Sequence, residues 1–344
     1  MPEAGKLHPD HEGVLRRDAA QDLTGGRRHE HAIAVDLGGT KVIAVVADSG
    51  GAILAERTEP TRTDSAEALL GQLRALAADL VRDAGLAWTT VGVLAIGVPG
   101  SVDPVSGEIR LAVNLPDLTG VSLAAQLATL GEGLRVVVEN DVNAAALGER
   151  WQGLATGADP FAFVAIGTGI GAGVVVNGEL CVGQRGAAGE IGWLPLGEDP
   201  FDPGTRHRGA LEEAVSGRAI VAGVERRLAA GATSELAAGC SAADVFAAAA
   251  RGDALACEAV DREARLVAMA VAALAVVVAP ELVVLGGSIG ANELLLEPVR
   301  RYAAELTAQP PRIERSALGS RAALVGALAL ALQSTCPEVL DRVP

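Results

Sequence analysis

The chain has 344 residues and a formal net charge of −15 at pH 7, and half of its residues are hydrophobic although only 2% are aromatic. The negative charge opposes non-specific attraction to nucleic acid and to anionic membranes, so we expect neither as a partner. The length allows two domains. The many small hydrophobic residues favour the closely packed helices and sheets of an α/β protein.

The ends of the chain and its cysteines exclude further classes. The first 31 residues contain no apolar run typical of a signal peptide, and we expect residues 1–31 to be a disordered tail. The longest apolar stretch, residues 266–278, is too short to span a bilayer, so we expect a cytoplasmic protein. The four cysteines are scattered without a C-x-x-C pair, which predicts neither a cysteine-based zinc cluster nor a disulfide framework.

The ordered part of the chain is predicted to begin at Ala32. Residues 32–56, "AIAVDLGGTKVIAVVADSGGAILAE", predict a strand, a glycine loop, a strand, a turn and a strand. Residues 65–85 form an amphipathic helix pattern with Ser65 as its cap. Strands are predicted at residues 91–98 and 134–140, and a helix follows from Asp141.

The opening pattern then recurs about 130 residues later. Residues 161–183, "FAFVAIGTGIGAGVVVNGELCVG", again predict strand, glycine loop, strand, turn and strand, which indicates an internal duplication. Helices are predicted at residues 211–230, 241–250 and 254–279, followed by the strand "ELVVLGG" and two terminal helices. We therefore expect one lobe at residues 32–155 and a second at residues 156–344, with the last helix free to pack back across the boundary.

The first glycine loop, "DLGGTK" at residues 36–41, lies between two predicted strands. Gly38 and Gly39 allow the backbone to approach a ligand closely, and the Thr40 hydroxyl and Lys41 add donors suited to a phosphate. The alternative is a tight glycine hairpin that binds nothing. This segment alone leaves both hypotheses open.

Two further glycine loops follow. "GTGIGAG" at residues 167–173 nearly matches a dinucleotide fingerprint, but that fingerprint requires a helix next and a strand pattern follows here. Neither hairpin loop matches the G-x-x-x-x-G-K-[ST] phosphate loop. "VVLGGSIG" at residues 283–290 leads into a helix. The three loops together predict a split nucleotide site, with phosphates between the lobes and the base against the third loop.

"ENDVNAAALGE" at residues 139–149 carries the candidate chemistry. Asp141 stands at a predicted helix start, where the helix dipole stabilises its ionised form. Such a carboxylate beside a phosphate site can accept a proton from an attacking hydroxyl group. The alternative is an N-cap aspartate. The neighbouring amides of Asn114, Asn140 and Asn143 suit a ligand with many hydroxyl groups.

With these motifs the chain resembles the ROK family of sugar kinases and sugar-responsive repressors, from about residue 32 to residue 332. The resemblance implies the two-lobed α/β actin-like ATPase (ribonuclease H-like) fold with duplicated strand–glycine loop–strand units. "DLGGTK" and "GTGIGAG" resemble the phosphate loops of the family, "GVPGSVD" and "NLP" its sugar-side loops, and "LVVLGGSIG" its adenosine loop.

The resemblance also implies a role for individual residues. Asp141 would be the general base, and Asp36 an outer-shell partner of Mg²⁺. The residues expected to face ATP are Gly38, Gly39, Thr40, Lys41, Gly167, Thr168, Gly169, Gly286 and Gly287. The residues expected to hold the sugar are Asn114, Asn140, Glu190 and Glu212.

The implied function is ATP-dependent phosphorylation of a hexose or N-acylated hexosamine hydroxyl by a cytoplasmic homodimer that uses ATP and Mg²⁺. The alternatives are a sugar-sensing transcriptional regulator and a non-catalytic sugar binder. A regulator of this family usually carries a DNA-reading domain before the first phosphate loop. No helix-turn-helix pattern precedes Ala32 in this sequence.

One family motif is altered. The family usually has G-E-I-G-H followed by C-x-C-G-x-x-G-C-L-E, in which one His and three Cys bind a structural zinc. Here the four ligand positions hold Trp193, Pro203, Thr205 and Ala210, whereas Glu190 and Glu212 remain. We therefore expect no zinc. Trp193 either stacks on the sugar or fills the space of the metal, and we favour the second hypothesis.

Overall fold

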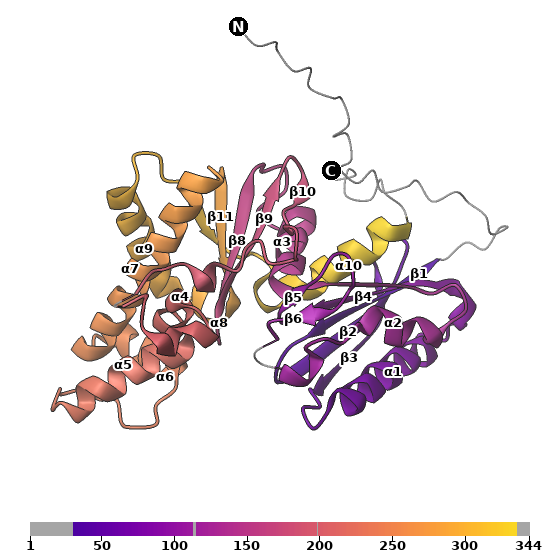
Figure 1. Ribbon diagram of the computed structural model, residues 1–344, viewed down its shortest axis with the longest axis horizontal. Helices are drawn as coiled ribbons and strands as arrows, with labels where there is room; N and C mark the ends of the chain where they lie inside the picture. Colours follow the sequence, from indigo (N-terminus) through magenta and orange to yellow (C-terminus); the bar gives the residue numbers. More distant parts are fainter. Residues whose placement is uncertain (1–29, 113–114, 198, 336–344) are drawn as a thin grey trace, which may run out of the picture.

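Two five-stranded sheets frame the molecule (Figure 1). The computed structural model describes residues 30–112, 115–197 and 199–335. The expected tail therefore lies outside the described residues except at its end. There Glu30 donates a backbone hydrogen bond to Thr90 (3.0 Å) and the first strand begins at His31, so the ordered chain starts earlier than Ala32.

The first sheet has the strand order β3-β2-β1-β4-β7. Its strands are β1 (His31–Leu37), β2 (Lys41–Asp48), β3 (Ile53–Pro60), β4 (Val91–Val98) and β7 (Arg135–Asn140). The pairs β1–β2 and β2–β3 are antiparallel, and the pairs β1–β4 and β4–β7 are parallel. The short pair β5 (Ser101–Val102) and β6 (Ile109–Arg110) stands beside it.

The second sheet repeats this plan with the order β10-β9-β8-β11-β12. Its strands are β8 (Phe161–Ile166), β9 (Ile170–Val176), β10 (Glu179–Leu180), β11 (Leu282–Gly286) and β12 (Arg312–Arg315). The directions match those of the first sheet strand for strand. The predicted duplication is confirmed, and β12 is the strand of this sheet that was not predicted from the sequence.

The two faces of the first sheet are covered by different helices. Along β1, Ile33, Val35 and Leu37 pack with α1 (Ala66–Asp83), whose N-cap is Ser65 as predicted. Ala32 and Ala34 face the other way and pack against α10 (Ala322–Thr335), which is yellow in Figure 1. The last helix therefore packs back onto the first sheet. The division into lobes at residues 155 and 156 remains our proposal.

Helix α3 (Asp141–Gln152) lies between the two sheets and crosses α10 at very close range. A Cβ atom on Gly326 would lie 1.6 Å from the carbonyl oxygen of Ala144, and one on Gly148 would lie 2.3 Å from that of Ala322. The two backbones are therefore in direct contact. On its other side, Ala145 and Ala146 of α3 belong to the same buried cluster as strands β8 and β9.

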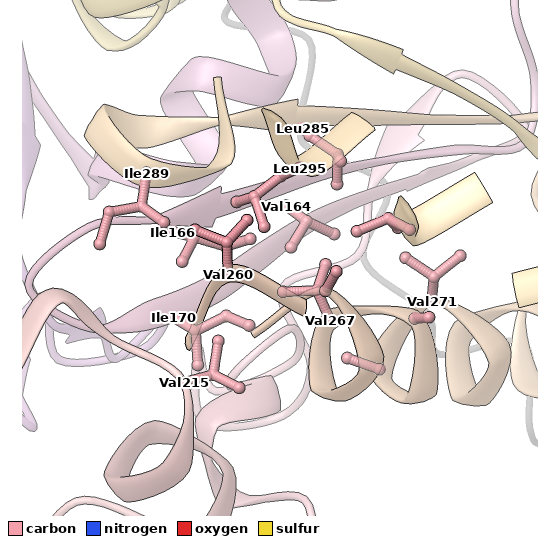
Figure 2. Packing of buried hydrophobic residues seen from close by; sticks show 14 of the residues in the cluster. Val164, Ile166, Ile170, Val215, Val260, Val267, Val271, Leu285, Ile289 and Leu295 are labelled. Carbon is pink, nitrogen blue, oxygen red and sulfur yellow. The ribbon is translucent and has the colours of Figure 1, made fainter. Parts of the chain in front are cut away.

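The core of the second sheet is formed against the long helix α7 (Ala254–Val277). Figure 2 shows Val260, Val267 and Val271 of this helix beside Val164 and Leu285 of the sheet. The remaining helices are α5 (Gly217–Ala229), α6 (Ala242–Ala250) and α9 (Glu293–Leu306), with short helices α2 (Leu123–Leu127), α4 (Ala210–Ala214) and α8 (Gly287–Gly290).

The predicted helix 211–230 is wrong in one respect, because the structure breaks it into α4 and α5. Val215 leaves the helical conformation, and the buried Ser216 then caps α5 by accepting a hydrogen bond from the Ala219 N–H. A serine cap competes with helix continuation because its hydroxyl group replaces a backbone acceptor. The break turns the chain sharply just after Glu212.

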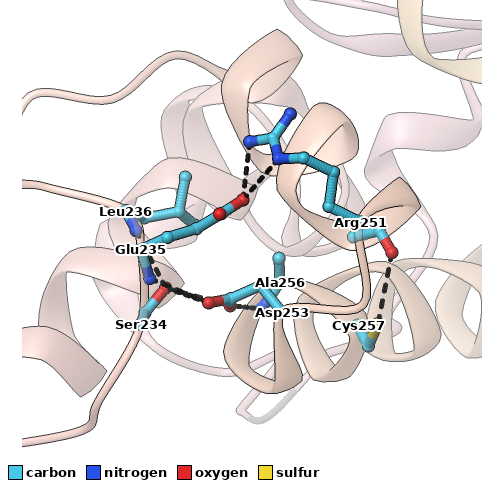
Figure 3. Close-up of polar contacts among 8 residues, drawn as sticks. Ser234, Glu235, Leu236, Arg251, Asp253, Ala256 and Cys257 are labelled. Atoms are coloured by element: carbon cyan, nitrogen blue, oxygen red, sulfur yellow. Dashed lines mark hydrogen bonds and ion pairs between the residues drawn. The ribbon is translucent and has the colours of Figure 1, made fainter.

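A second cap fixes the loop that connects α5 to α6. Asp253 caps α7 through the Ala256 N–H and also accepts hydrogen bonds from Ser234 and from the Glu235 N–H (Figure 3). Arg251 pairs with Glu235 at 2.6 Å. In the described ranges no helix is both long and apolar enough to cross a membrane, and Cys181, Cys240 and Cys257 form no disulfide there.

Candidate active site

The carboxyl ends of four parallel strands, two from each sheet, meet at one cleft. β4 ends before Pro99, β7 before Asp141, β8 before Gly167 and β11 before Gly287, and all four of these residues line a cavity of about 300 Å³. Ligands of open α/β sheets bind at such strand ends. The duplication therefore places the carboxyl-end edges of the two sheets on opposite sides of one ligand-sized space.

Asn140, not Asp141, caps α3. Its side-chain oxygen accepts hydrogen bonds from the N–H groups of Val142 and Asn143, both at 2.9 Å, and its amide nitrogen donates to the Gly100 carbonyl at 3.0 Å. The N-cap alternative for Asp141 is therefore wrong. Because both ends of the Asn140 amide are used by the protein, one amide hydrogen is left for a ligand in the cleft.

Asp141 occupies the first helical position and lines the cleft. Its Oδ1 accepts a hydrogen bond from the Val142 N–H at 2.9 Å. The pKa of Asp141 is raised to about 7. Burial is the largest cause, and the nearby carboxyl groups of Asp36 and Glu190 contribute to the same value. A carboxylate with this pKa exchanges protons near neutral pH.

Asp36 lies at the end of β1, behind the first glycine loop. Burial raises its pKa to about 6, and the ammonium group of Lys41 acts in the opposite direction. A magnesium ion that travels with ATP needs only one or two protein carboxylates. Asp36 does not line the cleft, but its carboxyl group raises the pKa of Asp141, and it remains our proposed carboxylate for the ion.

The predicted sugar ligands Glu190 and Glu212 both reach the cleft. Burial raises the pKa of each carboxyl group, and for Glu190 the neighbouring charge of Glu212 adds to the effect. Arg208 also lines the cleft and lies 4.0 Å from Glu212. The sequence analysis missed Arg208 as a cleft residue. Asn114, the remaining predicted sugar ligand, lies outside the described residues.

The glycine loops reach the cleft to different extents. Gly167, Thr168 and Gly169 all line it, but in the first loop only Gly39 does so, and Gly38, Thr40 and Lys41 do not. In the third loop Gly287 lines the cleft, with a φ of +78° that favours glycine. Gly286 lies behind the ring of Phe163, where a Cβ atom would come within 2.2 Å of the ring.

A second cavity of about 860 Å³ adjoins the cleft and shares Gly167 and Thr168 with it. Its walls come from α5, α6 and the start of α9. Apolar side chains of Phe246, Ile289 and Leu294 lie beside the polar residues Arg218, Ser288, Asn292 and Arg315. Ser288 and Ile289 belong to the predicted third loop, whereas the other five residues were not predicted from the sequence. The signal that could have found them is the alanine-rich face of α6 with a single aromatic residue, Phe246.

Trp193 is not enclosed. Its exposed fraction is 44%, and it lines the cleft, so the hypothesis that it fills the space of a metal is wrong. The altered loop packs through its backbone instead. Gly209 has a φ of +98°, and a Cβ atom there would lie 2.2 Å from the Gly192 carbonyl oxygen and 2.8 Å from the Cα atom of Trp193. Trp193 itself lines the cleft.

The residues at the four zinc positions of the motif carry no metal-binding side chain. Among the described residues no group of three or more His, Cys, Asp and Glu could hold a metal ion. His207, the one imidazole of this loop, is exposed. The expected absence of zinc remains a prediction for metal analysis.

Comparisons with known proteins agree with this geometry. The ROK family model matches residues 32–334. A glucokinase of Thermotoga maritima is 35% identical over 280 residues, covering 78% of this chain and 85% of the relative. An N-acetylmannosamine kinase of Citrobacter koseri is 34% identical over 309 residues, covering 87% of this chain and 98% of the relative.

Solved structures are similar over the same range. A ROK family glucokinase from Streptomyces griseus in complex with glucose and AMPPNP has a TM-score of 0.73 at 31% identity, covering 88% of this chain and 99% of its own. A ROK family transcriptional regulator, a homologue of the Escherichia coli MLC protein, has a TM-score of 0.77 at 26% identity. The match covers 92% of this chain and 82% of the regulator. The fold is that of the actin-like ATPases, and the chain belongs to the ROK family.

Proposed function

We propose that this protein transfers the terminal phosphoryl group of ATP to a hydroxyl group of a hexose or an N-acylated hexosamine. The observation that carries the proposal is the position of Asp141. Asp141 lines the cleft, its pKa is raised to about 7, and the cleft joins a second, larger cavity at Gly167 and Thr168. A sugar in the cleft and a nucleotide in the larger cavity would therefore meet beside one general base.

Each group of cleft residues has its own role in the proposed reaction. Asp141 accepts the proton of the attacking hydroxyl group, which makes the oxygen a better nucleophile as the new bond forms. Glu190 and Glu212 accept hydrogen bonds from other hydroxyl groups of the sugar and fix its orientation. The backbone N–H groups of Gly39, Thr168 and Gly169 would face the phosphates and offset their negative charge, whereas the Gly167 N–H is bonded to the Gly169 carbonyl oxygen.

Magnesium bound with ATP would supply further positive charge at the phosphates, and Asp36 is the carboxylate of this chain that would hold it. The cleft is lined from both sheets, so closing the sheets on the sugar would exclude water from the site. Exclusion of water matters because water is a competing phosphoryl acceptor. From the family resemblance we also propose a cytoplasmic homodimer that binds no nucleic acid.

The identity of the sugar depends on the part of the cleft where this chain departs from its family. The relatives include a glucokinase and an N-acetylmannosamine kinase, and both substrates fall within the proposed class. Trp193 and Arg208 line the cleft on the side of Glu190 and Glu212. We propose that the indole ring stacks on an apolar face of the sugar.

The proposal is tested by coupled ADP release across glucose, mannose, N-acetylglucosamine and N-acetylmannosamine, with magnesium and ATP in excess. We expect sugar-dependent turnover for at least one of them. Sugar binding without ADP release would identify a non-catalytic binder. The likeness to a transcriptional regulator supplies the second candidate function, and a nanomolar operator complex at physiological salt would favour it over a kinase.

A further inference from the structure

Glu212 touches the second glycine loop as well as the cleft. Its Oε2 accepts a hydrogen bond from the Ile170 N–H at 3.4 Å. A Cβ atom on Gly169 would lie 2.4 Å from the same oxygen and 2.9 Å from the carboxyl carbon. The carboxyl group therefore packs directly on the backbone of Gly169, beside the hairpin formed by β8 and β9.

Residues 212–217, the segment that begins at Glu212, also contact the start of this glycine loop at Gly167. The Gly217 N–H donates a hydrogen bond to the Gly167 carbonyl at 2.9 Å. Glu212 and Gly217 are separated by the sharp turn at Val215 and Ser216, and Ser216 is fully buried. Residues 212–217 thus fix residues 167–170 at both ends. A shift of Glu212 is passed to the backbone N–H groups that face the phosphates.

The side of Glu212 that faces the cleft is incompletely bonded. Its hydrogen bond to Ile170 is long, and Arg208 lies 4.0 Å away, beyond hydrogen-bond distance. Arg218 pairs with Glu213 at 3.0 Å instead. The carboxyl group of Glu212 therefore keeps acceptor capacity on its cleft side. A hydroxyl group donated from the cleft would hold it more firmly against the loop.

We propose that Glu212 couples the occupancy of the cleft to the affinity of the second glycine loop for the phosphates of a nucleotide. The inference rests on the proposed function and names a regulation within the same site. When a sugar fixes Glu212, the loop is already ordered and nucleotide binding no longer has to order it. By reciprocity, nucleotide raises sugar affinity by the same factor. Glu212 thus acts as a positioning residue for the second glycine loop.

Equilibrium titration tests this coupling without turnover. The dissociation constant of AMPPNP is measured with magnesium, in the absence and presence of saturating glucose or N-acetylmannosamine. For the unmodified protein we expect at least one of these sugars to tighten AMPPNP binding by about tenfold, a typical coupling between two sites. If neither sugar changes the affinity for AMPPNP, the proposal is overturned.

Variants separate coupling from sugar binding. The coupling factor is the ratio of the AMPPNP dissociation constants without and with sugar. In Glu212→Ala and Glu212→Asp, measured at saturating sugar, we expect this coupling factor to fall close to one, because neither side chain reaches Ile170. Glu190→Ala is the matched control, since Glu190 lines the same cleft without bonding to the loop. Glu190→Ala should weaken sugar binding and leave the coupling factor unchanged. Equal loss of the factor in the Glu190 and Glu212 variants would overturn the proposal, as would its retention in Glu212→Ala.

If Glu212→Ala fails to fold, Glu212→Asp carries the comparison, because it preserves the charge and shortens the side chain by one methylene group. The titration is also independent of the proposed chemistry. Absence of ADP release with every sugar would refute the kinase proposal while leaving the coupling factor measurable. A working kinase whose factor does not depend on Glu212 would refute only the coupling.

Discussion

The hydroxyl group of Ser316 donates a hydrogen bond to the carboxyl group of Glu149 at 2.5 Å, although 167 positions separate these residues. Glu149 is fully buried near the end of α3 and also accepts hydrogen bonds from the backbone N–H groups of Leu154 (2.9 Å) and Leu318 (3.2 Å). One carboxyl group therefore joins the two places where the chain passes between the sheets. This junction lies beside the crossing of α3 and α10, where the sheets would pivot.

Replacing Glu149 should destabilise the protein strongly. Glu149→Ala leaves the N–H groups of Leu154 and Leu318 and the Ser316 hydroxyl group without their acceptor, and we expect a loss of about 3–5 kcal/mol in the free energy of unfolding. Ser316→Ala should cost less, about 1–2 kcal/mol, because the Leu154 and Leu318 donors keep Glu149 and only the Gly319 N–H loses its acceptor, the Ser316 hydroxyl oxygen. Urea unfolding measures both. The exposed Glu305→Ala is the control, and a Glu149 variant as stable as that control would contradict the assignment.

Removal of the proposed base should separate chemistry from binding. Asp141→Asn keeps the size of the side chain, so we expect unchanged sugar affinity and a kcat lower by about 10²–10⁴-fold. Steady-state kinetics and sugar titration give the two quantities. Glu281→Gln, at an exposed position, controls for a general effect of lost negative charge. A variant with more than about half of the original kcat would remove Asp141 from the mechanism.

The pKa of Asp141 predicts how the rate responds to pH. A general base acts when it is deprotonated, so kcat/KM should rise with pH up to about 7 and level off above it. Below that pH the rate should fall by about tenfold per unit. The residual activity of Asp141→Asn should lack this dependence. A flat profile for the unmodified protein between pH 5.5 and pH 8 would show that Asp141 does not control the rate.

Trp193 should affect the sugar more than the fold. Because the indole ring is exposed and lines the cleft, Trp193→Ala should change the free energy of unfolding by less than about 1 kcal/mol. Loss of a stacking contact worth about 0.5–1.5 kcal/mol should raise the KM for the sugar by about 2- to 12-fold. Trp193→Phe should retain part of the contact. A large fall in stability with an unchanged KM would restore the packing hypothesis.

The altered motif predicts a protein that needs no zinc. Structural zinc requires four nitrogen or sulfur ligands, and the motif positions retain none. The untagged protein should contain less than about 0.1 equivalent of zinc, and EDTA should not shift its melting temperature in the absence of nucleotide. Metal analysis by mass spectrometry decides the matter. Stoichiometric zinc would show that another set of residues forms a site.

Local signals explain which parts of the fold could be predicted. The second hairpin turn was visible because Asn177 and Gly178 both adopt positive φ, at 53° and 74°, which few other residues tolerate. The first helix was visible because Ser65 caps a regular apolar pattern. The duplication followed from two copies of such signals. In each case the information lies within a few neighbouring residues.

The misses depend on partners far away in the chain. β12 has four residues of which only Ile313 is buried, and it exists because β11 offers a free edge. The exposure of Trp193 depends on the approach of Gly209, and the wall of the larger cavity depends on where α6 is placed. The roles of Asp141, Glu190 and Glu212 came from family resemblance, because a carboxylate in sequence alone carries no sign of its neighbours.

The position of α10 also has a consequence for biosynthesis. The first sheet is synthesised early, but the helix that covers one of its faces begins about 170 residues after the end of α3. Until then Ile43, Val45 and Val93 have no cover on that face. The nascent first sheet is therefore a candidate client for chaperones that shield apolar surface. A tag or fusion that displaces α10 would leave the finished protein with the same exposed face.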